Sequence, residues 1–235
     1  MPLQLKTSPP ILIFGTVDGA AGEVWLENKS GASITVSKAV VAVTVGAETD
    51  TGTITFADVP INNGAIKRVV FRFGLDVFTP PGTHPATVTL ETSAGSLPVT
   101  AELIVAKKLD LELAETSTVF TGVTASTTYQ GTVIAMNRGN IPVTVGEIPD
   151  EPLVEVVTTP RVLTVAPGGD VSVAPAPGLA PAGTATFTNT KPTVQPGDWA
   201  VVTFDLTTPA GLTADRYFRV LPRIATRRFV IDLVT

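Results

Sequence analysis

Short runs in which apolar and polar residues alternate recur along the whole chain. The alternation is clearest over residues 87–92, where Val88 and Leu90 are separated by threonines and followed by Glu91. A period of two is typical of β-strands with one buried face, so Val88 and Leu90 are predicted to face a core. No segment keeps an apolar period of 3.6 residues, which argues against helices. The first half predicts strands at residues 10–17, 22–28, 32–45, 51–56, 65–73, 84–92 and 96–106.

Turn residues separate these runs. The breaks carry glycine, proline, asparagine or aspartate, residues that tolerate turn dihedrals. They fall at Asp18-Gly19, Ser30-Gly31, Asn62-Asn63-Gly64, Pro80-Pro81-Gly82 and Ala94-Gly95. Seven short strands with turns at this spacing predict an all-β fold of the immunoglobulin-like sandwich type.

The second half of the chain repeats the plan of the first. Four pairs of short motifs recur in the same order: Phe14-Gly15-Thr16-Val17 with Phe120-Thr121-Gly122-Val123, Asn28-Lys29-Ser30-Gly31 with Asn137-Arg138-Gly139-Asn140, Ile34-Thr35-Val36 with Val143-Thr144-Val145, and Pro81-Gly82 before Val88-Thr89-Leu90 with Pro196-Gly197 before Val202-Thr203-Phe204. Recurrence in order indicates a duplicated unit. The chain is therefore predicted to hold two tandem immunoglobulin-like β-sandwich domains.

The predicted domain limits follow from this repeat. An N-terminal arm over residues 1–9 precedes a first domain at 10–107 and a second at 108–235, with the boundary at Lys107-Lys108. The second domain is longer because of an insertion near 166–182 that is rich in proline, glycine and alanine. Such a stretch is an extended surface loop or, alternatively, an arm that docks a partner.

Composition narrows the classes of function. Hydrophobic residues make up 44% of the chain and charged residues 16%, which indicates large cores, apolar surface covered by another subunit, or both. A net charge of −5 gives no general attraction for nucleic acid or an anionic membrane. With no cysteine, disulfides, thiolate catalysis and cysteine-ligated metals are excluded. No run approaches the length of a membrane span, and no signal peptide is recognisable, so a cytoplasmic or assembly-associated location is expected over secretion.

The motifs of the first domain resemble those of a known family. Phe14-Gly15-Thr16-Val17, Val24-Trp25-Leu26-Glu27-Asn28 and Phe78-Thr79-Pro80-Pro81-Gly82, followed by a threonine-rich alternating strand, are similar to the Hydin and major sperm protein type of immunoglobulin-like domain. The second domain lacks a counterpart of Phe78-Thr79-Pro80. The resemblance implies scaffolding and binding without chemistry, and it transfers no catalytic residue.

Candidate catalytic and metal-binding groups are few. His84 is the only histidine, and it lies in a proline-rich turn without the Gly-x-Ser-x-Gly motif of a nucleophile elbow. The acidic residues around Pro149 could offer oxygen ligands to calcium but lack the order of an EF-hand. Trp25 and Trp199 sit among apolar neighbours and are expected in cores, which leaves glycan binding open but unsupported. The chain is therefore predicted to be no enzyme and to need no cofactor or metal.

The remaining candidates are residues for interaction. A basic cluster near the C-terminus could meet an acidic group of a neighbouring copy or partner, because arginine binds carboxylates in two-point geometry, and two alternating leucines of the arm could add a strand to a neighbouring sheet. These residues are Arg216, Arg219, Arg223, Arg227 and Arg228, then Glu147, Asp150 and Glu151, and Leu3 and Leu5. We expect a structural or assembly protein, such as a subunit or accessory module of a bacterial or phage-type assembly, that contacts itself or other protein subunits. The alternative is a glycan- or peptide-binding module of a cell-surface system, and a small-molecule ligand is not expected.

Overall fold

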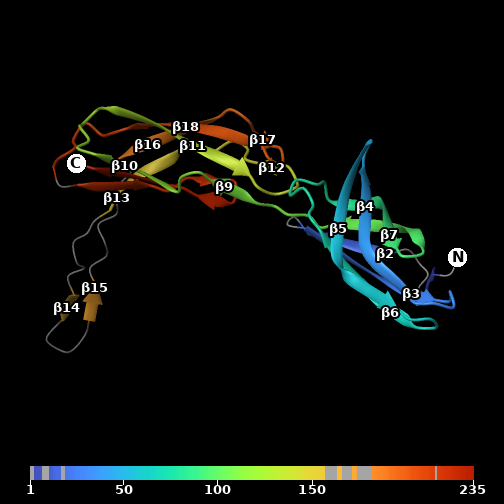
Figure 1. Ribbon diagram of the computed structural model, residues 1–235. Helices are drawn as coiled ribbons and strands as arrows, with labels where there is room; N and C mark the ends of the chain where they lie inside the picture. Colours follow the sequence, from blue (N-terminus) through green and yellow to red (C-terminus); the bar gives the residue numbers. More distant parts are fainter. Residues whose placement is uncertain are drawn as a thin grey trace. The chain divides into compact units, whose positions relative to one another are not determined.

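The computed structural model describes residues 3–6, 11–16, 19–156, 163–165, 171–173, 182–214 and 216–235. In this part of the chain the regular structure is all β-strand, and no helix is present (Figure 1). The chain divides into two compact units: Met1–Asp110 with Arg138–Ile141, and Leu111–Asn137 with Pro142–Thr235. The predicted boundary at Lys107-Lys108 lies just before this division.

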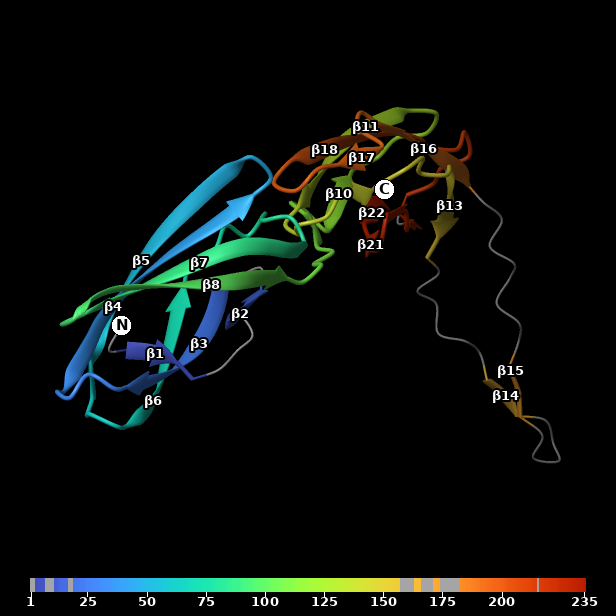
Figure 2. The same cartoon turned by 90° about the vertical axis from the view of Figure 1, so that its right-hand side faces the viewer.

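The described residues of the first unit form eight strands: β1 (Leu3–Leu5), β2 (Ile11–Thr16), β3 (Gly19–Asn28), β4 (Ile34–Val45), β5 (Glu48–Ile61), β6 (Ile66–Phe73), β7 (Gly82–Thr92) and β8 (Gly95–Val105). The strands β2 to β8 confirm the seven strands predicted for this half. β3 pairs with both β1 and β6, while β2, β8, β7, β4 and β5 are neighbours in that order. Figure 2 shows β6 and β3 on one side and the β8, β7, β4 and β5 group on the other.

The core of the first unit is formed by one face of each strand. Val24 and Leu26 of β3 and Val88 and Leu90 of β7 are buried, whereas Thr87 is exposed and Thr89, between the two β7 residues, is partly exposed. The inward direction predicted for Val88 and Leu90 is thus confirmed. Alternating burial from two sets of strands gives a β-sandwich, because each sheet contributes one apolar face to a shared core.

The N-terminal arm is part of this unit. Leu3, Gln4 and Leu5 of β1 pair antiparallel with Asn28, Glu27 and Leu26 of β3. Leu3 is only 4% exposed and belongs to the core. The expectation that this strand adds to a neighbouring sheet is therefore corrected over Leu3–Leu5: the strand pairs within its own unit, where Leu3 joins the core and Leu5 stays exposed. Residues 7–10 lie outside the described part of the chain.

The second unit contains β9 (Leu111–Leu113), β10 (Ser117–Thr121), β11 (Thr128–Asn137), β12 (Val143–Thr144), β13 (Glu151–Glu155), β14 (Leu163–Val165), β15 (Val171–Val173), β16 (Gly183–Asn189), β17 (Thr193–Val194), β18 (Trp199–Thr207), β19 (Tyr217–Val220), β20 (Arg223–Ile224), β21 (Arg227–Arg228) and β22 (Val230–Val234). Eight of these strands pair in the order β10-β22-β19-β13-β16-β18-β11-β9. Phe204 is central to its core, with ring centroids 6.1–6.3 Å from those of three other phenylalanines, Phe120, Phe187 and Phe229.

Both units follow the same pairing plan. The opening strand runs antiparallel to the third, β1 on β3 and β9 on β11. The next strand runs parallel to the last, β2 on β8 and β10 on β22. The third strand also pairs with a later one, β3 with β6 and β11 with β18. The units differ afterwards, since β5 pairs with β4 whereas β16 pairs with β18.

The strand registers align the two halves residue by residue. Gly22 pairs with Phe71 in the first unit, and Gly131 pairs with Phe204 in the second. Six residues beyond each glycine stands a buried asparagine, Asn28 at 0% and Asn137 at 1% exposure. The shared pattern is Gly-x-Val-x-x-x-Asn, read as GEVWLEN and GTVIAMN.

Each asparagine also holds the turn that opens the paired strand. Asn28 N donates to Ala65 O at 3.1 Å and Gly64 N donates to Asn28 O at 2.7 Å, while Asn137 makes the same two bonds with Asp198 and Gly197, both at 3.0 Å. Gly64 and Gly197 have φ of 74° and 76°, which glycine adopts without steric cost. Pro196-Gly197 therefore corresponds to Asn63-Gly64, and its predicted match with Pro81-Gly82 is wrong.

The insertion lies between β13 and β16. Within it, β14 and β15 pair antiparallel from Leu163 with Val173 to Val165 with Val171. Most of the predicted insertion near 166–182 lies outside the described residues.

Candidate interaction surfaces

Both tryptophans lie on outer sheet faces, which corrects the expectation that they are core residues. Trp25 is 40% and Trp199 is 53% exposed. In β3 the residues of even number, including Val24 and Leu26, are buried, so Trp25 points outward. In β18 the buried set is Ala200, Val202, Phe204 and Leu206, which turns Trp199 outward as well.

The outer face of β3 and β6 in the first unit combines apolar and charged side chains. Trp25 pairs across the strands with Arg68, and Val70 pairs with Glu23. Ile66 and Val70 are among the exposed large apolar residues, at 46% and 49%. We call this surface the β3–β6 face; its members are Glu23, Trp25, Glu27, Ile66, Arg68, Val70 and Arg72.

Ion pairs order part of the β3–β6 face. Arg68 Nε donates to Glu23 Oε2 at 2.7 Å. Lys29 and Lys6 approach Glu27 Oε2 at 3.2 and 3.4 Å. The hydrogen bond from Lys29, supported by Lys6, lowers the pKa of Glu27 against a smaller opposing effect of burial. Arg72 has no ion-pair partner among the residues that the structure describes. The face thus carries both signs of charge beside an exposed indole.

The outer face of β11, β18 and β16 in the second unit has a different chemistry. The part of this face around the first residues of β18 is apolar, because Met136 stands opposite Trp199 and Ile134 opposite Val201. Its other part is polar. Gln130 and Thr132 of β11 pair with Asp205 and Thr203 of β18, and the threonines of β16 continue the array at Thr184, Thr186 and Thr188. We call this surface the β11–β18 face.

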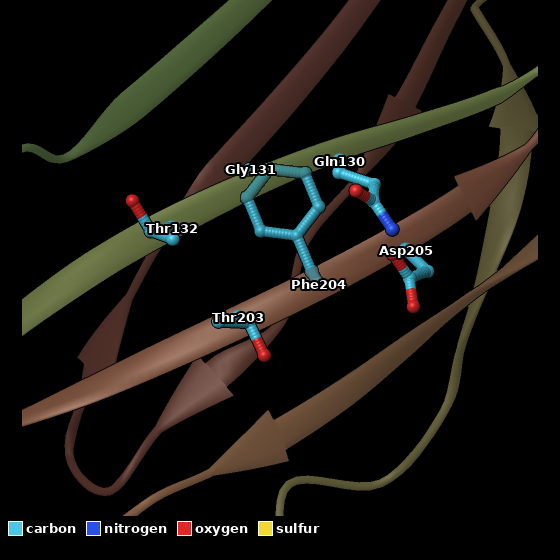
Figure 3. Close-up of a pocket in the computed structure, with 6 residues that line it drawn as sticks. All are labelled: Gln130, Gly131, Thr132, Thr203, Phe204 and Asp205. Atoms are coloured by element: carbon cyan, nitrogen blue, oxygen red, sulfur yellow. The ribbon is translucent and has the colours of Figure 1, made fainter.

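A shallow depression of about 470 Å³ lies in the polar part of this face, lined by Gln130, Gly131, Thr132, Thr203, Phe204 and Asp205 (Figure 3). Four of these residues are exposed while Phe204 is buried, so the depression opens on the outer face. The side chains of Gln130 and Asp205 have no hydrogen-bond or ion-pair partner within the described chain.

Trp199 is held at the apolar end by a fixed pair of charges. Lys191 Nζ lies 5.7 Å from the centroid of the indole ring and 2.7 Å from Asp198 Oδ2. Asp198 Oδ1 accepts a hydrogen bond from Trp199 N at 2.8 Å. The hydrogen bond from Lys191, followed by that from Trp199 N, lowers the pKa of Asp198.

The predicted arginine cluster is spread over the second unit, and part of it is paired within its own chain. Arg216 contacts Glu155 at 2.5 Å. Arg219 forms a two-point pair with Asp232, at 2.8 and 3.1 Å, and also donates to the hydroxyl of Tyr217. Arg227 Nε donates to Leu111 O at 2.5 Å. Arg223 and Arg228 are exposed register partners in the β20–β21 hairpin.

The predicted acidic partners lie elsewhere in the same unit. Glu147 and Asp150 are exposed in the segment before β13, and Glu151 begins that strand. In the described residues, no group of three or more histidine, cysteine, aspartate and glutamate side chains is arranged to hold a metal. His84 Nε2 lies 2.8 Å from Pro80 O, a contact within its own turn.

No known protein family matches the sequence. No curated protein matches it either. Solved structures with weak likeness include a protein of unknown function from Porphyromonas gingivalis W83, at 12% identity and a TM-score of 0.32 over the whole of both chains. The class 5 fimbriae chaperone CfaA is similar at 10% identity and a TM-score of 0.29 over 99% of both chains. A PapD-like domain of human CEP192 is similar at 16% identity and a TM-score of 0.25, over 53% of this chain and 84% of that domain.

These likenesses are too weak to indicate a function. None of the described segments forms an apolar helix of membrane-spanning length.

Proposed function

We propose that the protein is a pair of tandem immunoglobulin-like sandwiches that acts without catalysis as a structural or assembly subunit. The shared pairing plan of the units supports the tandem fold. In both units the first strand pairs antiparallel with the third, and the second strand pairs in parallel with the last. The sequence resemblance to Hydin and major sperm protein domains agrees with this proposal.

The observation that carries the assembly role is the exposure of Trp25 on the β3–β6 face. Single exposed apolar residues are normal on a protein surface, whereas a contiguous apolar group marks an interaction site. Here Trp25, Ile66 and Val70 share one face of two paired strands. Tryptophan and arginine are among the residues most enriched in the energetic centres of protein interfaces. Arg68 stands opposite Trp25, and Arg72 lies further along the same strand.

The mixed charge of this face favours a second copy of the chain as the partner. In a two-fold interface a surface meets itself, so each arginine of one copy can face a glutamate of the other. Glu23 and Glu27 on β3 and Arg68 and Arg72 on β6 supply both signs. A face with one sign of charge would repel its own copy. We therefore assign self-association to the β3–β6 face.

Cysteine cross-linking tests this assignment directly, because the native chain has no cysteine. Val70→Cys places one thiol on the β3–β6 face, and Thr203→Cys places a matched exposed thiol on β18. With a short bis-maleimide reagent, Val70→Cys should give a covalent dimer whose yield rises with protein concentration and falls when Trp25→Ala is added. A yield no greater than that of Thr203→Cys would contradict the proposal.

A further inference from the structure

We infer that the β11–β18 face binds an uncharged oligosaccharide, with Trp199 as the stacking platform and the depression at Gln130 and Asp205 as the polar site. This goes beyond the assembly role, since the surface lies in the other unit and shares no residue with the β3–β6 face. A pyranose ring has an apolar C–H face and a rim of hydroxyls, so its site needs an exposed aromatic ring together with hydrogen-bonding groups.

Trp199 meets the first requirement. More than half of its surface is exposed. Two neighbours restrict its motion: Asp198 Oδ1 accepts a hydrogen bond from its backbone N–H, and Lys191 Nζ lies 5.7 Å from the ring centroid. A side chain that is already ordered loses little conformational entropy on binding. Met136 stands opposite Trp199, and Val201 is two residues further along β18; both are partly exposed and add apolar surface to this end of the face.

The depression meets the second requirement. Gln130 offers an amide donor and acceptor, Asp205 a carboxylate acceptor, and Thr132 and Thr203 hydroxyls that can do either. Sugar hydroxyls both donate and accept, and they match this mixed set. Because the Gln130 and Asp205 side chains have no partner in the described part of the chain, a ligand need not break an internal bond to reach them.

The spacing of the two parts sets the size of the ligand. Thr203 and Asp205 follow Trp199 by four and six residues along β18, which corresponds to about 13 and 20 Å at the rise of a β-strand. A single sugar cannot span this distance, whereas an extended oligosaccharide can. Ile134 and Val201 lie between Trp199 and the depression. On the other side of β18, β16 places Thr188 opposite Thr203 and Thr186 opposite Asp205.

The charge of the site selects an uncharged ligand. Asp205 has no cationic partner among the described residues, and it would repel the carboxylates or sulfates of an anionic glycan. Lys191, beside Trp199, is already paired with Asp198.

Affinity electrophoresis of the full chain tests the inference. The native gels contain soluble starch, hydroxyethyl cellulose, laminarin, galactomannan or xylan, with alginate and heparin as anionic comparisons. We expect retardation by at least one neutral polysaccharide, followed by calorimetry with the corresponding hexasaccharide. Trp199→Ala and Asp205→Ala should each weaken binding about tenfold or more, roughly 1.4 kcal/mol, and Trp199→Phe should restore part of it.

The matched control is Trp25→Ala, which removes an exposed indole from the other unit and should leave glycan binding unchanged. Circular dichroism of each variant checks that the fold is intact. Retardation by no neutral polysaccharide, retardation by the anionic ones alone, or equal binding by Trp199→Ala would overturn the inference. Because Trp199→Ala should leave self-association unchanged, a failure here is distinguishable from a failure of the assembly role.

Discussion

The ring of Phe204 lies against Gly131 on the neighbouring strand, so closely that a Cβ at Gly131 would stand 2.3 Å from Phe204 Cζ (Figure 3). Gly22 and Phe71 repeat the relationship in the first unit, where the added Cβ would stand 2.7 Å from the ring. In each unit, then, the space of a missing side chain is filled by a phenylalanine from the paired strand. The glycine is required by packing, since neither position is among the glycines with positive φ.

The first prediction concerns this packing. Gly131→Ala should destabilise the second unit by about 1–3 kcal/mol, because the new methyl group must displace a buried aromatic ring. Chemical denaturation measures the change. Gly211→Ala is the control, since nothing lies within 4 Å of its added Cβ. Phe204→Leu in the Gly131→Ala background should recover part of the lost stability. An unfolding transition unchanged by Gly131→Ala would contradict a tight contact between Gly131 and Phe204.

The second prediction concerns the buried asparagine of the first unit. Asn28 Nδ2 donates to Ala32 O at 2.8 Å and Ile61 O at 2.6 Å, and Asn28 Oδ1 accepts from Ser30 N at 2.9 Å. Asn28→Asp keeps the acceptor but removes both donations. It should cost about 2–3 kcal/mol because Ile61 O and Ala32 O each lose a donor, although Ala32 O keeps the bond from Ser30 Oγ. Asn63→Ala, which removes one exposed bond to Gly31 N, should cost clearly less in the same denaturation experiment. Equal losses would contradict this account.

The third prediction is a pH dependence at Asp232. Burial raises the pKa of Asp232, but the hydrogen bonds from Arg219 and Tyr217 and the charge of Arg219 outweigh it, so the pKa is lowered. A lowered folded-state pKa contributes stability above the unfolded value near pH 4, and this stability is lost as pH falls through the folded value. Asp232→Asn should therefore lower the melting temperature at pH 7, and its difference from the parent should shrink below about pH 4. A difference that is the same at pH 3 and pH 7 would count against this role.

The fourth prediction concerns residues 138–141, which belong to the first unit. Asn140 Oδ1 accepts from Lys108 N at 2.7 Å, and Asn140 Nδ2 donates to Ala106 O at 2.8 Å and Thr79 O at 3.1 Å. A fragment of residues 1–107 lacks these bonds and should fold with a lower melting temperature than the first unit has in the whole chain. Asn140→Ala in the whole chain should likewise lower the melting temperature of the first unit. A fragment as stable as the intact unit would show that the bonds contribute nothing.

Sequence reasoning found most of the strands of the first unit because Gly, Pro and Asn punctuate an otherwise regular alternation. It misplaced Trp25 because three apolar residues in a row, Val24 to Leu26, hide which parity faces the core. In the structure the residues of β3 that share the parity of Gly22 and Asn28 are buried, so Trp25, of the opposite parity, faces outward. The same spacing recurs in β11 from Gly131 to Asn137. The motif Gly-x-Val-x-x-x-Asn was therefore a better signal of duplication than the short glycine and threonine motifs.

Other features could not be obtained from the sequence. That β16 pairs with β18 while β5 pairs with β4 depends on contacts between distant segments, which no local pattern specifies. The β11–β18 face was missed for the same reason, since Gln130 and Asp205 meet only through the register of two strands.

Light scattering of the unaltered chain after size-exclusion chromatography, over a wide range of protein concentration, tests the central claim of assembly through the β3–β6 face. We expect the mass to rise from that of the monomer toward twice that value. The curve of mass against protein concentration should shift to higher concentration in Trp25→Ala but not in Trp199→Ala. Raised salt should weaken the association, because exposed charge pairs are screened over about 8 Å at physiological ionic strength. A monodisperse monomer at the highest concentration would contradict the claim.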